Sequence, residues 1–183
     1  MSTFTDESML LIENWDTVRD ILRAHDSLSG ELITVLNSLE SELAQMPWWP
    51  DQWHFAQTRR AQVYISNGNW RQGDGYAVWI GVERVSPDHL FGSGPAANLY
   101  VWIRDNDALL AELIRQRQNP GEELPGEVDL RTSNGYVVRE AIGQYIGGDV
   151  EAYVAELRAQ ILGFFGTYAQ WLWGIDEAIR RHL

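Results

Sequence analysis

The C-terminal segment of this chain, residues 148–183, carries the pattern that most restricts the fold. Apolar residues recur there every three or four positions through about 30 residues, as they do along one face of an α-helix. These positions are Val150, Val154, Leu157, Ile161, Phe164, Tyr168, Trp171, Ile175 and Ile179. The segment is therefore predicted to be one long helix of roughly 45 Å, which is longer than a domain of this size requires.

The middle of this helix is apolar on nearly every side and has no charged residue from Ala159 to Ile175. We expect it to be buried between the N-terminal helices and a sheet, and a dimer seam is a second, compatible interpretation. The residues of this core or dimer seam are Phe164, Tyr168, Trp171 and Ile175. A membrane span is disfavoured because the run is short and contains Gln160 and Gln170.

The N-terminal segment, residues 1–47, is predicted to be an acidic pair of helices. The first covers residues 6–24, and the second begins at Asp26 or Ser27 and runs to about Met46. Their apolar stripes consist of Leu11, Trp15, Val18 and Leu22 in the first helix and Leu28, Leu32, Val35, Leu39, Leu43 and Met46 in the second. The first 50 residues hold nine carboxylates and only two arginines, so negative potential is concentrated at this end of the chain.

The middle segment, residues 54–146, contains short runs of alternating apolar and polar residues, which are typical of strands. Four strands are expected, over residues 55–65, 76–85, 99–104 and 135–142. Turn signals at Asn67-Gly68 and at Gly73-Asp74-Gly75 lie between the first two. Short connections among the first three strands favour antiparallel pairing.

One helix and two loops are expected within this middle segment. Residues 105–118 have helical spacing and begin with Asp105 or Asn106, whose side chains suit a helix N-terminus. Residues 86–95 and 119–132 are rich in Gly and Pro and are expected to be loops. We therefore predict a single α+β domain over residues 1–183, in which helices cover one face of a mainly antiparallel sheet of about four strands.

The absence of lysine and cysteine excludes several classes of site. All 14 basic residues are arginines, and they face 26 carboxylates for a net charge of -12. A P-loop, a Schiff-base enzyme and a thiol nucleophile cannot be built from this chain. The four histidines lack metal-ligand spacing, so we expect no metal and no cofactor.

The charge also limits the partners. Nucleic acid and anionic membranes are bound mainly by cationic side chains, so neither is expected as a direct ligand. The acidic N-terminus lacks the basic region of a secretory signal, so a cytoplasmic location is expected.

Two sets of side chains are candidates for binding a protein partner. The first set contains the carboxylates Glu13, Asp16, Asp20, Glu31, Glu40 and Glu42. The second set is aromatic with one arginine and contains Trp48, Trp49, Trp53, Trp70 and Arg71. Acidic helix faces can dock on basic proteins, and Trp and Arg are enriched in interface hot spots. A solvated helix face and core packing are the alternative interpretations of the two sets.

These observations favour a protein that works by binding and is not an enzyme. The most concrete hypothesis is an inhibitor or regulator whose acidic surface docks on a basic, nucleic-acid-handling complex, such as an anti-defence protein encoded by a phage or plasmid. One alternative is a ligand pocket lined by Trp70 and Trp79, or a hydrolase site using Glu83 and His89. Another is a structural homodimer formed through the C-terminal helix.

Overall fold

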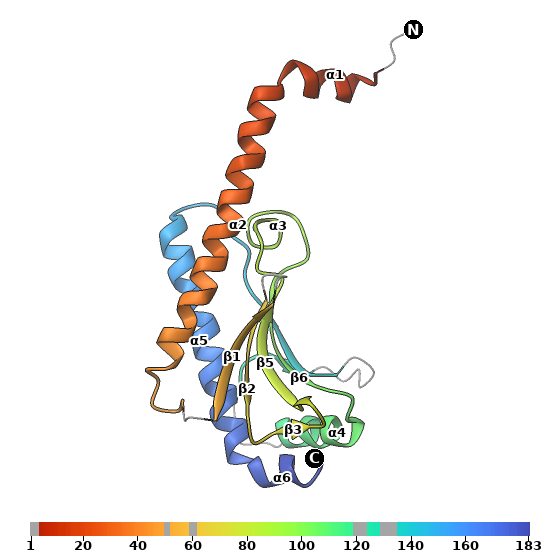
Figure 1. Cartoon of the computed structure of the whole chain (residues 1–183), viewed down its shortest axis with the longest axis vertical. Coiled ribbons are helices and arrows are strands. Elements are labelled where there is room, and N and C mark those ends of the chain that lie inside the picture. The colour runs from red at the N-terminus through yellow and green to blue at the C-terminus, as the bar shows by residue number, and fades with distance from the viewer. Residues whose placement is uncertain (1–3, 50–51, 59–61, 119–123, 129–134) are drawn as a thin grey trace.

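Antiparallel strand pairing organises the centre of the molecule (Figure 1). The computed structural model describes residues 4–49, 52–58, 62–118, 124–128 and 135–183. Six strands form one sheet in the order β1-β2-β5-β6-β8-β7, and all of their pairings are antiparallel. Their bounds are Trp53–Thr58 (β1), Gln62–Asn67 (β2), Val78–Glu83 (β5), Asn98–Ile103 (β6), Glu127–Val128 (β7) and Tyr136–Ala141 (β8). A separate hairpin consists of Arg71–Gln72 (β3) and Gly75–Tyr76 (β4).

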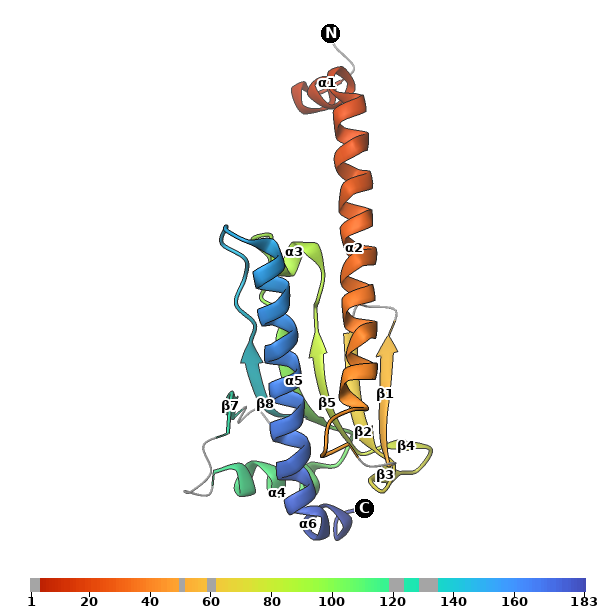
Figure 2. The ribbon, with the colours of Figure 1, turned by 90° about the vertical axis from the view of Figure 1, so that its left-hand side faces the viewer.

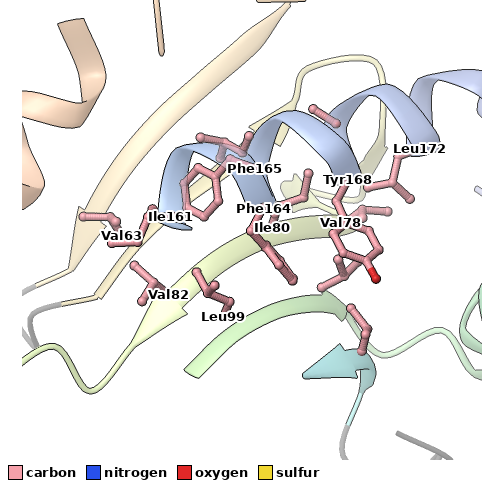
Figure 3. Packing of buried hydrophobic residues seen from close by; sticks show 14 of the residues in the cluster. Val63, Val78, Ile80, Val82, Leu99, Ile161, Phe164, Phe165, Tyr168 and Leu172 are labelled. Carbon is pink, nitrogen blue, oxygen red and sulfur yellow. The ribbon is translucent and has the colours of Figure 1, made fainter. Parts of the chain in front are cut away.

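Two long helices, α2 (Trp15–Leu43) and α5 (Val150–Gly174), cover one face of this sheet (Figure 2). Aliphatic side chains alternate along the central strands, so that one face is apolar and receives the helices. Figure 3 shows Ile161 and Phe165 of α5 above Val82 of β5. The shorter helices are α1 (Asp6–Glu13), α3 (Pro87–Leu90), α4 (Asp107–Arg117) and α6 (Asp176–Arg180). The predicted α+β fold, with a mainly antiparallel sheet and a long C-terminal helix on its helical side, is confirmed.

The N-terminal helices differ from the predicted pair. The break lies at Asn14, and Asp26 and Ser27 are inside α2. Asn14 leaves the helical backbone region, with φ -112° and ψ 24°, and its side-chain amide donates to the Leu10 carbonyl at 2.8 Å. Ser27 instead donates to Glu31 at 3.2 Å from within the helix. A residue able to cap a helix does not end one when the apolar stripe continues past it.

The sheet has more strands than the sequence predicts. The expected strand over residues 55–65 is two strands, β1 and β2, and the residues 59–61 between them lie outside the described residues. The expected loop over residues 119–132 also lies largely outside the described residues, but it contains β7. The expected loop over residues 86–95 contains α3, which Pro87 opens at the first helical turn.

The other helices follow the sequence closely. Asn106 caps α4, because its side-chain oxygen accepts the Leu109 N–H at 2.9 Å. The C-terminal helix is interrupted at Ile175, which has φ -114° and separates α5 from α6. Asp176, the first residue of α6, accepts a 2.7 Å hydrogen bond from the Trp70 indole N–H. This contact links α6 to the turn between β2 and β3. In the described part of the chain, no helix is long and apolar enough to cross a membrane.

Candidate functional site

A projecting arm, residues 4–24, is the most unusual feature of the surface. It comprises α1 and the first turns of α2, and both views show it extending beyond the sheet and α5 (Figures 1 and 2). Thr5 caps α1, because its hydroxyl oxygen accepts the Ser8 N–H at 3.3 Å. The body ends near His25, whose Nε2 lies 3.7 Å from the Asp88 carboxylate of α3.

The apolar stripe of α2 continues from the core into the arm. In the lower half of the helix it is fully buried, at Leu32, Leu36, Leu39 and Leu43. One turn above the body the same face is exposed, with Ile21 at 62% and Leu22 at 57%. Trp15 is 60% exposed at the start of the helix. The lower half of the stripe is buried in the core, and the upper half is exposed. Burial of the upper half would require a partner from outside the described residues.

The first helix adds to this apolar surface. Leu10, Leu11 and Ile12 on α1 are all at least half exposed. The predicted stripe does not form on one helix, because the break at Asn14 places Leu11 on α1. Leu11, Trp15 and Leu22 are exposed, and Val18 is half-buried. Isolated helices of this length are marginally stable in water. The arm would gain stability from any surface that buries it.

Three of the predicted carboxylates, Glu13, Asp16 and Asp20, lie exposed on this arm. Arg19 lies 3.0 Å from Asp16, and Arg23 lies 3.7 Å from Asp20. Exposed pairs of this kind are weak and leave both charges accessible to a partner. The arm therefore presents apolar side chains bordered by an excess of negative charge.

The other predicted carboxylates lie on the body and belong to different surroundings. Glu42 is ion-paired with Arg158 of α5. Glu31 accepts from Ser27 and lines a groove between α2 and α5. Glu40 is exposed on the lower part of α2. The structure thus brings Glu13, Asp16 and Asp20 into one region and leaves the remaining three outside it.

The predicted tryptophan set forms a packed cluster. Trp53 contacts Trp48, Trp49 and Trp70, with ring centroids 5.5 to 6.3 Å apart. Trp70 is fully buried. Arg71 lies 5.2 Å from the centroid of the Tyr76 ring and donates to the Asp74 carbonyl. Trp53 and Trp70 are core residues. Of the four predicted tryptophans, only Trp48 and Trp49 are half-buried, at the edge of the core.

The residues predicted for the core or dimer seam face the protein's own sheet. Phe164, Tyr168 and Trp171 are buried, and Ile175 is half-buried at the end of the same cluster. The Tyr168 hydroxyl accepts from Arg117 at 3.2 Å and donates to the Pro125 carbonyl. Burial raises the pKa of this phenol above its usual value.

The predicted acid–base pair is not assembled. Glu83 accepts from Arg139 and from the Tyr136 hydroxyl, both at 3.2 Å. His89 instead has its Nδ1 2.6 Å from the Ser86 hydroxyl of its own loop. Because the two side chains have separate partners, the geometry of a shared proton transfer is missing.

A second surface, which we call the aromatic cup, lies on the opposite face of the sheet. Its lining residues are Gln62, Tyr64, Trp79, Tyr100, Trp102 and Tyr136, from β2, β5, β6 and β8. A pocket containing both Trp70 and Trp79 was one prediction from the sequence, but Trp70 belongs to the core on the helical side. The signal for the cup was present in the sequence as aromatic residues at alternate positions of neighbouring strands. Only the strand register shows that they converge.

No cluster of three or more His, Asp or Glu side chains suited to a metal ion occurs among the described residues. Comparison with known proteins found no matching family model, no matching curated protein and no matching solved structure.

Proposed function

We propose that this protein acts by binding another protein through the projecting arm. The observation that carries the proposal is the apolar stripe of α2, which is buried at Leu32 and Leu36 and exposed at Ile21 and Leu22. Exposed apolar patches on soluble proteins commonly mark interaction sites. A helix that lays such a face into a groove is a recurrent mode of recognition.

The chemistry of the arm indicates the partner. Its apolar side chains need an apolar groove, and Glu13, Asp16 and Asp20 favour a groove bordered by Arg and Lys. A second copy of this chain would bring two acidic arms together, and this repulsion disfavours self-association as the main use of the surface. The partner is therefore a protein with a basic surface.

Basic surfaces of this kind are typical of nucleic-acid-handling complexes. We propose that the chain is a non-enzymatic inhibitor or regulator of such a complex, as an anti-defence protein of a phage or plasmid would be. The support for this narrower proposal is the distribution of charge, with nine carboxylates in the first 50 residues. Carboxylates spaced along a helix can occupy the places where phosphates would lie.

The test begins with affinity capture from a host lysate and continues with the purified partner. Trp15→Ala should weaken binding by about tenfold or more, because exposed aromatic anchors dominate interfaces. Trp173→Ala is the matched control, since Trp173 is also exposed but lies on α5 far along the chain from the arm. If both variants bind like the native protein, the arm is not the docking surface.

Charge reversal tests the electrostatic part separately. Asp16→Arg and Asp20→Arg should slow association and reduce its dependence on salt, whereas reversal of the exposed Glu177 on α6, Glu177→Arg, should change little. Sedimentation of the protein alone shows whether the arm binds a second copy of the chain. A dimer that Trp15→Ala dissociates and Trp173→Ala does not would identify a second copy as the partner and overturn the proposal of a basic one.

A further inference from the structure

The aromatic cup is a cavity of about 240 Å³ on the face of the sheet opposite α2 and α5. Its six lining residues come from four adjacent strands, so regular sheet structure positions the site. It is distant in sequence from the projecting arm and does not depend on the proposed function.

The floor of the cup depends on the register between β5 and β6. Gly81 pairs with Tyr100, and a Cβ atom at Gly81 would lie 2.4 Å from the Tyr100 ring. The absence of a side chain at Gly81 lets this ring lie across the neighbouring strand. Tyr100 is only 4% exposed, and its hydroxyl accepts from Gln62 Nε2 at 2.6 Å. The floor is therefore held in place by packing and by one short hydrogen bond.

Two pairs of rings in the cup meet nearly at right angles, and a third pair is tilted. Tyr64 and Trp79 are inclined by 88°, and Tyr100 and Tyr136 by 90°. Trp79 and Trp102 are inclined by 40° with centroids 4.6 Å apart. A slot that stacks a planar ligand on both of its faces needs two parallel walls, and none of these three pairs is parallel. These inclined rings instead line one cavity of about 240 Å³ from several strands, which suits a compact, rounded group.

The electrostatic surroundings favour a cation. None of the six lining residues is charged, and the faces of aromatic rings carry partial negative charge. The same face already holds one cation against a ring, because the Arg139 guanidinium lies 4.7 Å from the Tyr136 ring centroid. Arg139 is neutralised by its ion pair with Glu83. The net charge of the whole chain is -12, which also favours a cationic ligand.

We propose that the aromatic cup binds a quaternary ammonium group through cation–π interactions. Aromatic cages of Trp and Tyr are the usual recognition device for choline and methylated lysine. A trimethylammonium group is compact and rounded, and it does not require a hydrogen-bond donor or acceptor for its positive head. These properties match a cup of mutually inclined aromatic rings whose lining includes one amide side chain, that of Gln62.

The first test compares choline with 3,3-dimethylbutan-1-ol, its neutral isostere, by titration calorimetry on the full chain. The two compounds have the same shape, so any difference measures the charge. Choline should bind at least about tenfold more tightly. Equal affinity for the isostere, tighter binding of indole or adenine, or no choline binding in the millimolar range would each overturn the proposal.

Substitutions locate the binding. Tyr64→Leu and Trp79→Leu should each weaken choline binding by about tenfold, because each removes one ring face. Tyr64→Phe keeps the ring and should retain the affinity, and Trp173→Leu on α5 is the control for loss of a tryptophan elsewhere. A urea midpoint for each variant establishes that it is folded. Unchanged affinity in both leucine variants would exclude the cup as the site.

The source of the ammonium group requires a further comparison. A peptide containing trimethyl-lysine and the same peptide with unmodified lysine are titrated alongside free choline. Tighter binding of the trimethylated peptide assigns the cup to a protein side chain, and equal or tighter binding of choline assigns it to a small molecule. Equal affinity for the two peptides would contradict recognition of the quaternary group.

Discussion

At the residue scale, the open face of the sheet depends on the contrast between Gly81 and Tyr100. Gly81 has no side chain, and the Tyr100 ring lies across it and is almost completely buried. The sequence shows both residues but not their pairing, because register is a property of two strands. The consequences of this contact can be tested by substitutions at Gly81 and at Tyr100.

Gly81→Ala should lower the free energy of unfolding by about 1–3 kcal/mol, because the added methyl group overpacks against the Tyr100 ring. The measurement is a urea titration. Gly163→Ala is the matched control, since a Cβ at Gly163 of α5 meets no atom within 4 Å and alanine favours a helix. The control should be neutral or stabilising. Equal behaviour of the two variants would contradict the close approach.

Tyr100 should also make stability depend on alkaline pH. Burial raises the pKa of this phenol well above its usual 10.0, and the hydrogen bond from Gln62 opposes that shift to a smaller extent. The folded chain therefore holds the phenolic proton more tightly than the unfolded chain does. This contribution to stability is fully present below pH 10.0 and is lost as the pH rises above it.

Tyr100→Phe removes both the proton and the hydrogen bond. The variant should be about 1 kcal/mol less stable than the native protein at neutral pH. Between pH 8 and pH 11 it should lose less stability than the native protein, as measured by urea titration. A native protein and a variant with parallel alkaline profiles would show that Tyr100 is not protected from ionisation.

At the element scale, α2 is one helix in two environments. Its lower half packs on the sheet beside α5, and its upper half extends into the projecting arm (Figure 2). Helical spacing predicts both halves equally well, because it reports which residues share a face. It does not report whether another element lies against that face. The predicted break near Asp26 is absent, and the chain breaks at Asn14 instead, so the predicted pair of helices is a short helix followed by a long one.

Hydrogen exchange should separate these two environments. Amide protons of residues 6–24 should exchange much faster than those of Leu36 to Leu43, because helices without tertiary packing open readily. Mass spectrometry of the exchanged chain gives the comparison within one molecule. Bound partner should slow exchange in the arm. Equal protection of the two halves in the free protein would mean that the arm is already covered.

At the scale of the whole molecule, the two candidate surfaces have different chemistry and lie on different elements. The projecting arm is apolar and acidic and extends from the helical layer. The aromatic cup is uncharged and lies on the opposite face of the sheet. A partner could therefore occupy the arm without covering the cup.

Features that depend on near neighbours in the chain could be predicted from the amino-acid sequence. The long C-terminal helix, the helix start at Asp105 or Asn106, the central strands and the α+β class all follow from residue spacing and local capping preferences. The exclusion of P-loop, Schiff-base and thiol chemistry follows from composition alone. These conclusions hold because each depends on a residue type or on contacts within a few positions of the chain.

The packing of whole elements determines which side chains meet and which remain uncovered. It placed Trp70 in the core, Trp79 in the aromatic cup and Trp15 on the exposed arm, although all three are the same residue type. It also separated Glu83 from His89 and joined Glu42 to Arg158. Burial and long-range contact depend on how whole elements pack against one another, and no local pattern in the chain records that arrangement.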